Sequence, residues 1–322
     1  MYRRTLCPWL MAGVILLVVS PALGRYPLEI RDVLSGDPVA SAIFFRIRVP
    51  RILAGLMVGA SLASSGAAFQ GLFRNPLASP GLLGASSGAA FGAALGIFLT
   101  LGTGTIELAS FFGGLAAVIG TFFLGRRFAV GGTFGLILSG IMVSSLFSAA
   151  VSFLKFFADP TDTLPNIVFW LMGSLSSTDM NDVVRITLPV IAGLCLLWGS
   201  AWRVNVLSLG EAEAAALGLD VRLWRTAIIV GSTVLVASAV SISGVIGWVG
   251  LVVPHFVRFL VGPDFRLVIP WSGAFGGVFL LAADTVSRTA FPVEIPLGIL
   301  TAMIGIPCFL ILMGRKGGPL WR

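Results

Sequence analysis

The chain has 322 residues, of which 57% are hydrophobic and only 11% are charged, and its mean hydropathy is +1.01. This composition lies far outside the range of soluble globular proteins and predicts an integral membrane protein. The net charge of +7 would suggest nucleic-acid binding in a soluble protein, but the basic residues here fall between hydrophobic runs, so membrane topology explains them and no nucleic-acid partner is expected.

Successive hydrophobic runs are long enough to cross a bilayer, which takes about 20 apolar residues per helix. They predict about ten transmembrane helices in a single membrane domain, residues 1–322, with no second soluble domain. In chain order the runs lie near 7–24, 52–72, 82–101, 106–124, 132–154, 183–202, 226–243, 245–261, 267–286 and 295–313. The first run also resembles a secretory signal peptide, but an uncleaved first crossing is favoured because so many spans follow it.

Residues 226–261 are too long for one crossing and short for two. Ser243 and Gly244 stand at their centre and can turn the chain, so a tight helical hairpin is expected. Elsewhere glycines recur at every fourth residue, at Gly84, Gly88, Gly92 and Gly96, with Gly55 and Gly59 as a shorter case. Such ridges let helix backbones approach closely in a membrane bundle.

Ten crossings place both termini on the cytoplasmic side of the membrane, together with most of the 21 basic residues. Two connections on the outer side look ordered. Residues 25–50 contain a short surface helix near 28–34, and residues 155–180 contain a turn followed by a short interfacial helix. Arginines crowd the stretch from Arg25 to Arg51 against the usual charge rule, which suggests a function: Arg25, Arg31, Arg46, Arg48 and Arg51.

Several kinds of chemistry have no motif in this chain. The only lysines, Lys155 and Lys316, lack the glycine spacing of a phosphate loop, so no ATP binding by that route is expected. His255 is the only histidine and the three cysteines are isolated, so neither a metal site nor a cofactor is expected. We therefore expect a non-enzymatic membrane protein.

Asp284 is the one acidic residue well inside a hydrophobic run. A carboxylate at such a place is by default a candidate for proton or ion transport. Arg288, however, follows four residues later on the same helical face, and an ion pair between the two is the favoured interpretation. For His255 a structural role is favoured.

Six sequence blocks, in order along almost the whole chain, resemble the FecCD-type permeases, the membrane subunits of importers for ferric siderophores, haem and cobalamin. They are Arg48-Val49-Pro50-Arg51, the Gly59-Ala60-Ser61-Leu62 block, Asn75-Pro76-Leu77-Ala78-Ser79-Pro80-Gly81, the Gly244 to His255 block, Gly262-Pro263-Asp264-Phe265-Arg266 and Pro296-Leu297-Gly298.

This resemblance implies an all-α polytopic protein of the bacterial inner membrane with the type II ABC importer permease fold, and it makes the two ordered outer connections periplasmic. It implies two copies of the permease around a central pathway, two cytoplasmic ATPase subunits that hydrolyse the ATP, and a periplasmic substrate-binding protein. The implied cargo is an iron chelate, either a ferric siderophore or haem, or cobalamin, and its identity is set by the binding protein.

Arg48, Arg51 and Arg288 match positions at which such permeases meet acidic residues of the binding protein. Arginine clusters on an outer surface can also form bidentate pairs with carboxylates and so orient a docking partner. The alternative is that these side chains reach lipid phosphates. Docking is favoured because positive charge on the outside opposes the topology rule.

The cytoplasmic segment 205–222 matches the paired coupling helices that fit into the ATPase subunits. Its alanines favour a helix, and Gly210 and Gly218 bracket it. Its candidate contacts are Glu211, Glu213, Ala215 and Gly218. A solvated loop is the alternative, but it leaves so many alanines unexplained.

Gate and pathway residues are also implied. Asn75 and Leu77 match a cytoplasmic gate, and Thr133 and Phe134 fall at a second gate, where Phe134 departs from the small polar residue expected. Ser145, Ser148 and Ser152 share one helical stripe, which suits a wettable pathway wall. Hydroxyls that bond their own helix carbonyls explain the stripe equally well.

The main functional alternative is an ion-coupled secondary transporter, a class that needs ionisable groups inside the membrane. Only Asp284 supports it, and it leaves the alanine-rich segment without a role. An intramembrane enzyme is the third and weakest alternative, because the sequence shows no catalytic pair.

Overall fold

A computed structural model describes residues 2–24, 26, 28–127 and 132–314, and within these ranges all regular structure is helical. The helices are α1 (Tyr2–Val19), α2 (Ile30–Leu34), α3 (Pro38–Ala42), the π-helix η1 (Ile43–Arg48), α4 (Val49–Leu72), α5 (Ala85–Phe98), α6 (Thr103–Arg127), α7 (Gly132–Phe157), α8 (Thr163–Leu171), α9 (Met180–Gly199), α10 (Ala201–Leu209), α11 (Glu211–Ala216), α12 (Val221–Ser243), α13 (Val249–Val261), α14 (Phe265–Thr289) and α15 (Leu297–Gly314).

Each of the ten predicted hydrophobic runs coincides with one helix. Six segments are long and apolar enough to cross a membrane: Pro38–Leu72, Thr103–Arg127, Thr133–Phe157, Met180–Gly199, Val221–Ser243 and Phe265–Thr289. Shorter apolar helices cover Ala85–Phe98, Val249–Val261 and Leu297–Leu312. The predicted all-α polytopic membrane fold is therefore confirmed.

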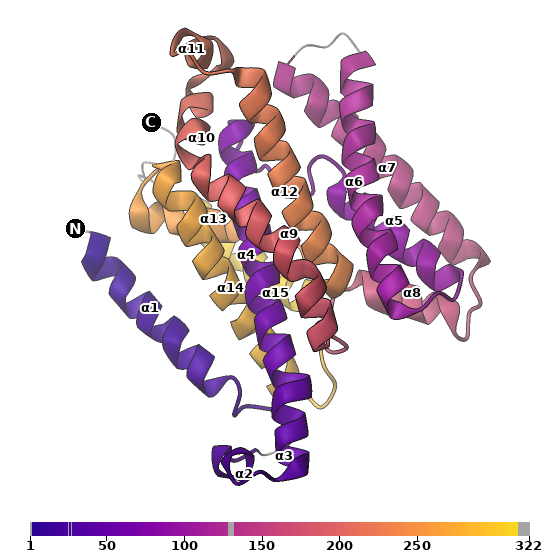
Figure 1. The fold of residues 1–322 in the computed structure, drawn as a ribbon. Coiled ribbons are helices and arrows are strands. Elements are labelled where there is room, and N and C mark those ends of the chain that lie inside the picture. The colour runs from indigo at the N-terminus through magenta and orange to yellow at the C-terminus, as the bar shows by residue number, and fades with distance from the viewer. Residues whose placement is uncertain (1, 25, 27, 128–131, 315–322) are drawn as a thin grey trace.

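Helix α4 lies at the centre of the bundle, where α9, α12, α13 and α14 pack around it (Figure 1). Small side chains make this possible. Ala54, Ala63 and Ala67 are completely buried, and so is Val58. Because lipid is as apolar as these side chains, close van der Waals packing stabilises such a bundle more than apolar burial does.

Helices α5, α6, α7 and α8 form a second group, on the right in Figure 1. The predicted glycine ridge lies in it. A methyl group on Gly88 would come within about 2.5 Å of the Ala117 side chain, and one on Gly92 within 2.6 Å of the Ala109 carbonyl carbon. Gly84 departs from the prediction, since it precedes α5 in the left-handed region, at φ 90°.

The prediction of a tight helical hairpin over residues 226–261 is wrong. Helices α12 and α13 both pack on α4 rather than tightly against each other. The turn between them is hydrogen-bonded to another part of the protein: the Ser174 amide donates to the Ser243 carbonyl at 2.8 Å, and Gly244 adopts a φ of 66°. Irregular backbone within a membrane protein is tolerated where the protein itself supplies its hydrogen bonds, as it does here.

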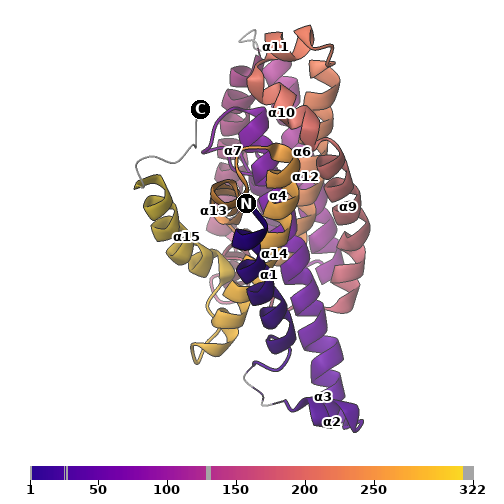
Figure 2. The same cartoon turned by 90° about the vertical axis from the view of Figure 1, so that its left-hand side faces the viewer.

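The two ends of the bundle differ in structure. One end carries α11, and the opposite end carries α2 and α3 (Figures 1 and 2). We call them the α11 end and the α2 end. The short helices predicted in the two ordered connections are present as α2 and α8. The predicted location of both termini concerns residues 1 and 315–322, which lie outside the described residues.

Candidate functional sites at the two ends of the bundle

The α11 end carries a short alanine-rich helix closed at both sides by glycine. Gly210, with φ 140°, separates α11 from α10. Gly218, with φ 81°, ends α11: its amide donates to the Ala215 carbonyl, and the Leu219 amide donates to the Ala214 carbonyl. This is the Schellman arrangement, which requires a left-handed residue and so favours glycine. The sequence expectation of a bracketed helix in segment 205–222 is met.

One face of α11 is anchored and the other is open. Ala214 is completely buried. Glu211, Glu213, Ala215 and Gly218, the four predicted contacts for an ATPase, are all exposed. The segment therefore presents small side chains, the Glu213 carboxylate and Leu217 outward, from a fixed base.

Glu211 joins α11 to two long helices. Its carboxylate forms an ion pair with Arg225 of α12 and accepts a hydrogen bond of 3.1 Å from the Thr133 hydroxyl at the start of α7. Arg225 lowers the pKa of Glu211 below its ordinary value of 4.5, and Thr133 adds to that effect. The structure thus brings a predicted coupling residue into contact with a predicted gate residue.

Replacing Glu211 with glutamine should loosen α11. Because the folded-state pKa of Glu211 is lowered, its ion pair stabilises the segment above about pH 4.5, and this stabilisation is lost as the pH falls through the folded pKa. We expect less protection of the amides of residues 205–222 against hydrogen exchange, relative to the intrinsic rate at each pH, in Glu211→Gln at neutral pH, and in the wild type only below about pH 4.5. Glu213→Gln is the matched control, and equal exchange in both variants would contradict the prediction.

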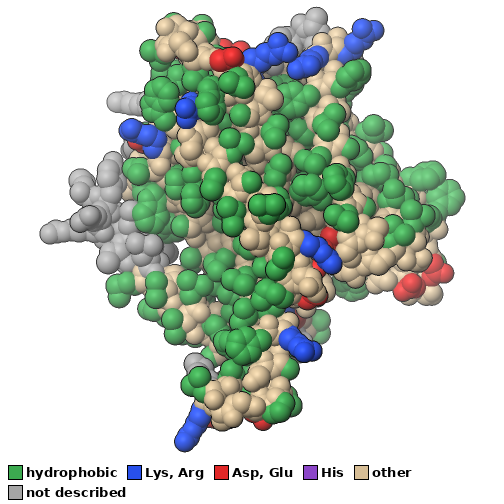
Figure 3. Space-filling view, in the orientation of Figure 1, with side chains coloured by type: hydrophobic (Ala, Val, Ile, Leu, Met, Phe, Trp, Pro, Cys, Tyr) green, Lys and Arg blue, Asp and Glu red, His purple; other side chains and the backbone are tan. Residues whose placement is uncertain are grey.

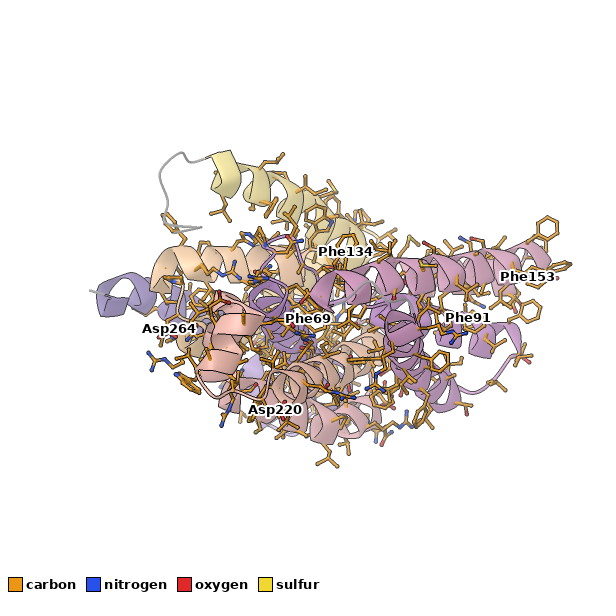
Figure 4. The ribbon with its side chains drawn as sticks, turned by 90° about the horizontal axis from the view of Figure 1, so that it is seen from above. Phe69, Phe91, Phe134, Phe153, Asp220 and Asp264 are labelled. Atoms are coloured by element: carbon orange, nitrogen blue, oxygen red, sulfur yellow. The ribbon has the colours of Figure 1, made fainter. Side chains whose placement is uncertain are left out.

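The remaining predicted gate and pathway residues lie between and along the helices. Asn75 and Leu77 follow α4, where the Leu77 amide donates to the Asn75 side chain at 2.9 Å and Leu77 is 56% exposed. Phe134 is 65% exposed, and Figure 4, viewed from the α11 end, shows it on α7, with Phe69 among the central helices.

The predicted serine stripe lies on the exposed surface of α7. Ser145, Ser148 and Ser152 are all exposed. The Ser145 hydroxyl donates to the Ile141 carbonyl at 2.9 Å, and the Ser152 hydroxyl donates to the Ser148 carbonyl at 3.0 Å. Two of the three hydroxyls are thus satisfied by their own helix, and the stripe as a wall of a pathway stays a prediction.

At the α2 end, the three arginines predicted to lie on an outer surface point inward instead, which corrects that part of the expectation. Arg48, Arg51 and Arg288 are only 4%, 6% and 5% exposed. Arg48 donates to the carbonyls of Pro21 and Tyr26, and Arg288 donates to the Ser20 carbonyl at 2.8 Å. Arg48 and Arg288 thus hold the chain after α1 against the end of η1 and against α14. Docking itself stays a prediction.

Arg51 and Arg288 share a buried carboxylate. Asp284, completely buried, accepts from Arg51 at 2.8 Å and lies 3.6 Å from Arg288 Nε. Arg51 also pairs with Glu294 at 2.9 Å. The i, i+4 pair of Asp284 and Arg288 was predicted. The partnership of Arg51 with Asp284 and Glu294 was not, because nothing local in the sequence connects residues more than 200 positions apart.

Comparison with known proteins identifies the family of this chain. The model of the FecCD transport family matches residues 11–315. The chain belongs to the FecCD transport family. Its membership confirms the resemblance stated from the six sequence blocks.

Curated members of the family named for different cargoes are similar to this chain. The molybdate import system permease protein MolB of Haemophilus influenzae is 41% identical, with 98% of each chain covered. The cobalamin import system permease protein BtuC of Halobacterium salinarum is 43% identical over 85% of this chain and 74% of its own. The hemin transport system permease protein HmuU of Yersinia pestis is 38% identical, with 96% of each covered. The FecCD chain described here is thus a multi-pass transport permease.

A solved structure of a putative metal-chelate type ABC transporter, in an inward-facing conformation, matches at a TM-score of 0.89 and 39% identity, covering 97% of this chain and 99% of that one. A second structure, PsaBC from Streptococcus pneumoniae with a Fab, matches at a TM-score of 0.59 and 17% identity, and supports the fold alone. The predicted permease fold of an ABC importer is therefore confirmed.

Proposed function

We propose that the chain is the transmembrane subunit of an ABC importer for a metal-containing solute, driven by two separate cytoplasmic ATPase subunits and fed by a periplasmic binding protein. The observation that supports this most directly is the contact of Glu211 with Thr133 and Arg225. It gives a force applied to α11 a direct route to the first turns of α7 and α12.

The geometry of α11 suits a lever between an ATPase and the bundle. Its exposed side carries the small side chains of Ala212, Ala215 and Ala216, which let a partner's groove come close, and Leu217, 64% exposed, adds an apolar contact beside them. Its buried Ala214 fixes the other side. A displacement of α11 therefore moves Glu211 and, through Thr133, the end of α7 that carries Phe134. The α11 end is accordingly the cytoplasmic end in this proposal.

Replacing Ala215 with glutamate should uncouple this lever. A larger, charged side chain on the open face prevents close contact with a partner, while the permease stays folded because the position is exposed. In vesicles that contain the permease, its ATPase and its binding protein, we expect transport to fall below a tenth of the wild-type rate while ATP hydrolysis continues. Ala215→Ser is the matched control, and coupling that is unchanged in Ala215→Glu would remove α11 from the mechanism.

The cargo proposal rests on what the relatives are named for. Molybdate, cobalamin, hemin and iron chelatin all contain or bind a metal, yet they range from a small oxyanion to large chelates. We propose a cargo of this class, with an iron chelate (ferric siderophore or haem), cobalamin and molybdate as the candidates to label in the vesicle assay. The molybdate relative adds a candidate that the sequence blocks alone did not suggest.

Two further partners belong to the proposal. A second copy of the chain would complete the pathway, with the exposed face of α7 available to it. A binding protein at the α2 end would use Arg48, Arg51 and Arg288 only after their internal contacts open, since all three are buried. The ion-coupled alternative is not favoured, because Asp284, its one supporting residue, already pairs with two arginines.

A further inference from the structure

A cavity of about 570 Å³ opens at the α11 end between the last turn of α6, the start of α7 and the start of α12. Three arginines line it, Arg126, Arg222 and Arg225, and Glu211 is the one carboxylate among the described lining residues. Arg225 pairs with Glu211, whereas Arg126 and Arg222 form no ion pair within the described part of the chain. The cavity therefore holds an excess of positive charge that an anion would stabilise.

The cavity lies where an apolar surface ends. On α6, Ile119 and Phe123 are 68% and 73% exposed, and Arg126 follows within one turn. On α12, Val230 is 50% exposed and follows Thr226, which lines the cavity, by one turn. Figure 3 shows the same change of surface: basic side chains stand near the α11 end, above a face covered mostly by hydrophobic side chains.

We propose that this cavity binds the phosphate group of an anionic phospholipid. Guanidinium groups bind phosphate oxygens in bidentate geometry, and basic pockets between transmembrane helices bind anionic headgroups. The exposed apolar side chains of α6 give the acyl chains a surface that continues from the headgroup into the membrane. Free phosphate offers the same charge to the arginines but makes no use of that surface.

A phosphate in the cavity would also affect segment 205–222, because Arg225 lines the cavity and pairs with Glu211. A phosphate held by Arg126 and Arg222 would leave Arg225 paired with Glu211 and reduce the repulsion among the three guanidinium groups. The site is thus a place where lipid composition can set the position of α11. The lipid-binding proposal itself does not depend on the proposed importer function.

The first test measures lipid binding to the purified full-length chain by native mass spectrometry, during titration with dioleoylphosphatidylglycerol or dioleoylphosphatidylcholine. We expect the anionic lipid to bind more tightly. The double variant Arg126→Gln/Arg222→Gln should weaken its binding about 10- to 30-fold, from about 1 kcal/mol per basic residue. The double variant Arg31→Gln/Arg46→Gln removes the same charge from exposed positions at the α2 end and should leave binding unchanged.

The second test separates the two sources of phosphate. Phe123→Ser should weaken phosphatidylglycerol binding and leave any binding of inorganic phosphate unchanged. If inorganic phosphate occupies the site and Phe123→Ser has no effect on the lipid, the cavity serves a soluble anion and the lipid proposal fails. It fails equally if both double variants lose binding to the same extent, or if neither does. Arg222→Gln alone, at an exposed position, repeats the test should the double variant unfold.

Discussion

Replacing Asp284 with asparagine is expected to lower the free energy of unfolding by about 3–5 kcal/mol, the usual loss when one member of a buried ion pair is removed. The carboxylate is completely buried and contacts both Arg51 and Arg288. Without it, two buried guanidinium groups face each other with only Glu294 as a counter-charge. The amide can still accept one hydrogen bond, but it cannot balance the charge.

The measurement is the SDS concentration at which half of the purified chain unfolds. Glu294→Gln should show a smaller loss, because the Glu294 side chain is 28% exposed and water screens the pair. Asp32→Asn, on the exposed surface of α2, should change stability by less than about 0.5 kcal/mol. Equal stability in Asp284→Asn and Asp32→Asn would mean that the buried arginines find other partners.

Much of the fold was predictable because hydropathy reports the length and position of each membrane segment. The ten runs, the short helices α2 and α8, and the close approach at Gly88 and Gly92 follow from local composition. The packing of α12 and α13 did not follow. Hydropathy shows that a segment avoids water, but it does not show which helix lies beside it, and α4 lies against both.

The candidate sites were predictable as residues and not as contacts. The alanines and flanking glycines of segment 205–222 predict its helix. No local feature of the sequence shows that Glu211 contacts Thr133, 78 positions earlier. The count of spans placed Arg51 on the outer side of the membrane, against the charge rule. Neither the count nor the rule reports contacts between helices, so neither shows that Asp284 of α14 pairs with Arg51 and holds its side chain within the protein. The i, i+4 pair of Asp284 and Arg288 was recoverable because helical spacing alone brings it together.

Replacing Gly59 with alanine is expected to be nearly as damaging as the loss of Asp284. Gly59 of α4 faces Gly276 of α14, and an added methyl group would come within 2.6 Å of the Gly276 carbonyl carbon and 2.9 Å of the Gly277 Cα. The obstacle is backbone, which cannot rotate away as a side chain can, so the two helices must separate. Overpacking of this kind costs about 1–3 kcal/mol, and we expect the upper end because α14 is a principal neighbour of the central helix.

Gly55→Ala is the matched control, because it makes the same substitution one turn earlier in α4. There the added methyl group would lie 3.5 Å from the Leu175 side chain, an ordinary contact, and alanine favours the helix over glycine by about 1 kcal/mol. We expect Gly55→Ala to match or exceed the wild type in the fraction that remains monodisperse on size-exclusion chromatography after heating, while Gly59→Ala loses most of its folded peak. If the two variants behaved alike, α4 and α14 would be able to move apart enough to accept the added methyl group, and the prediction would be wrong.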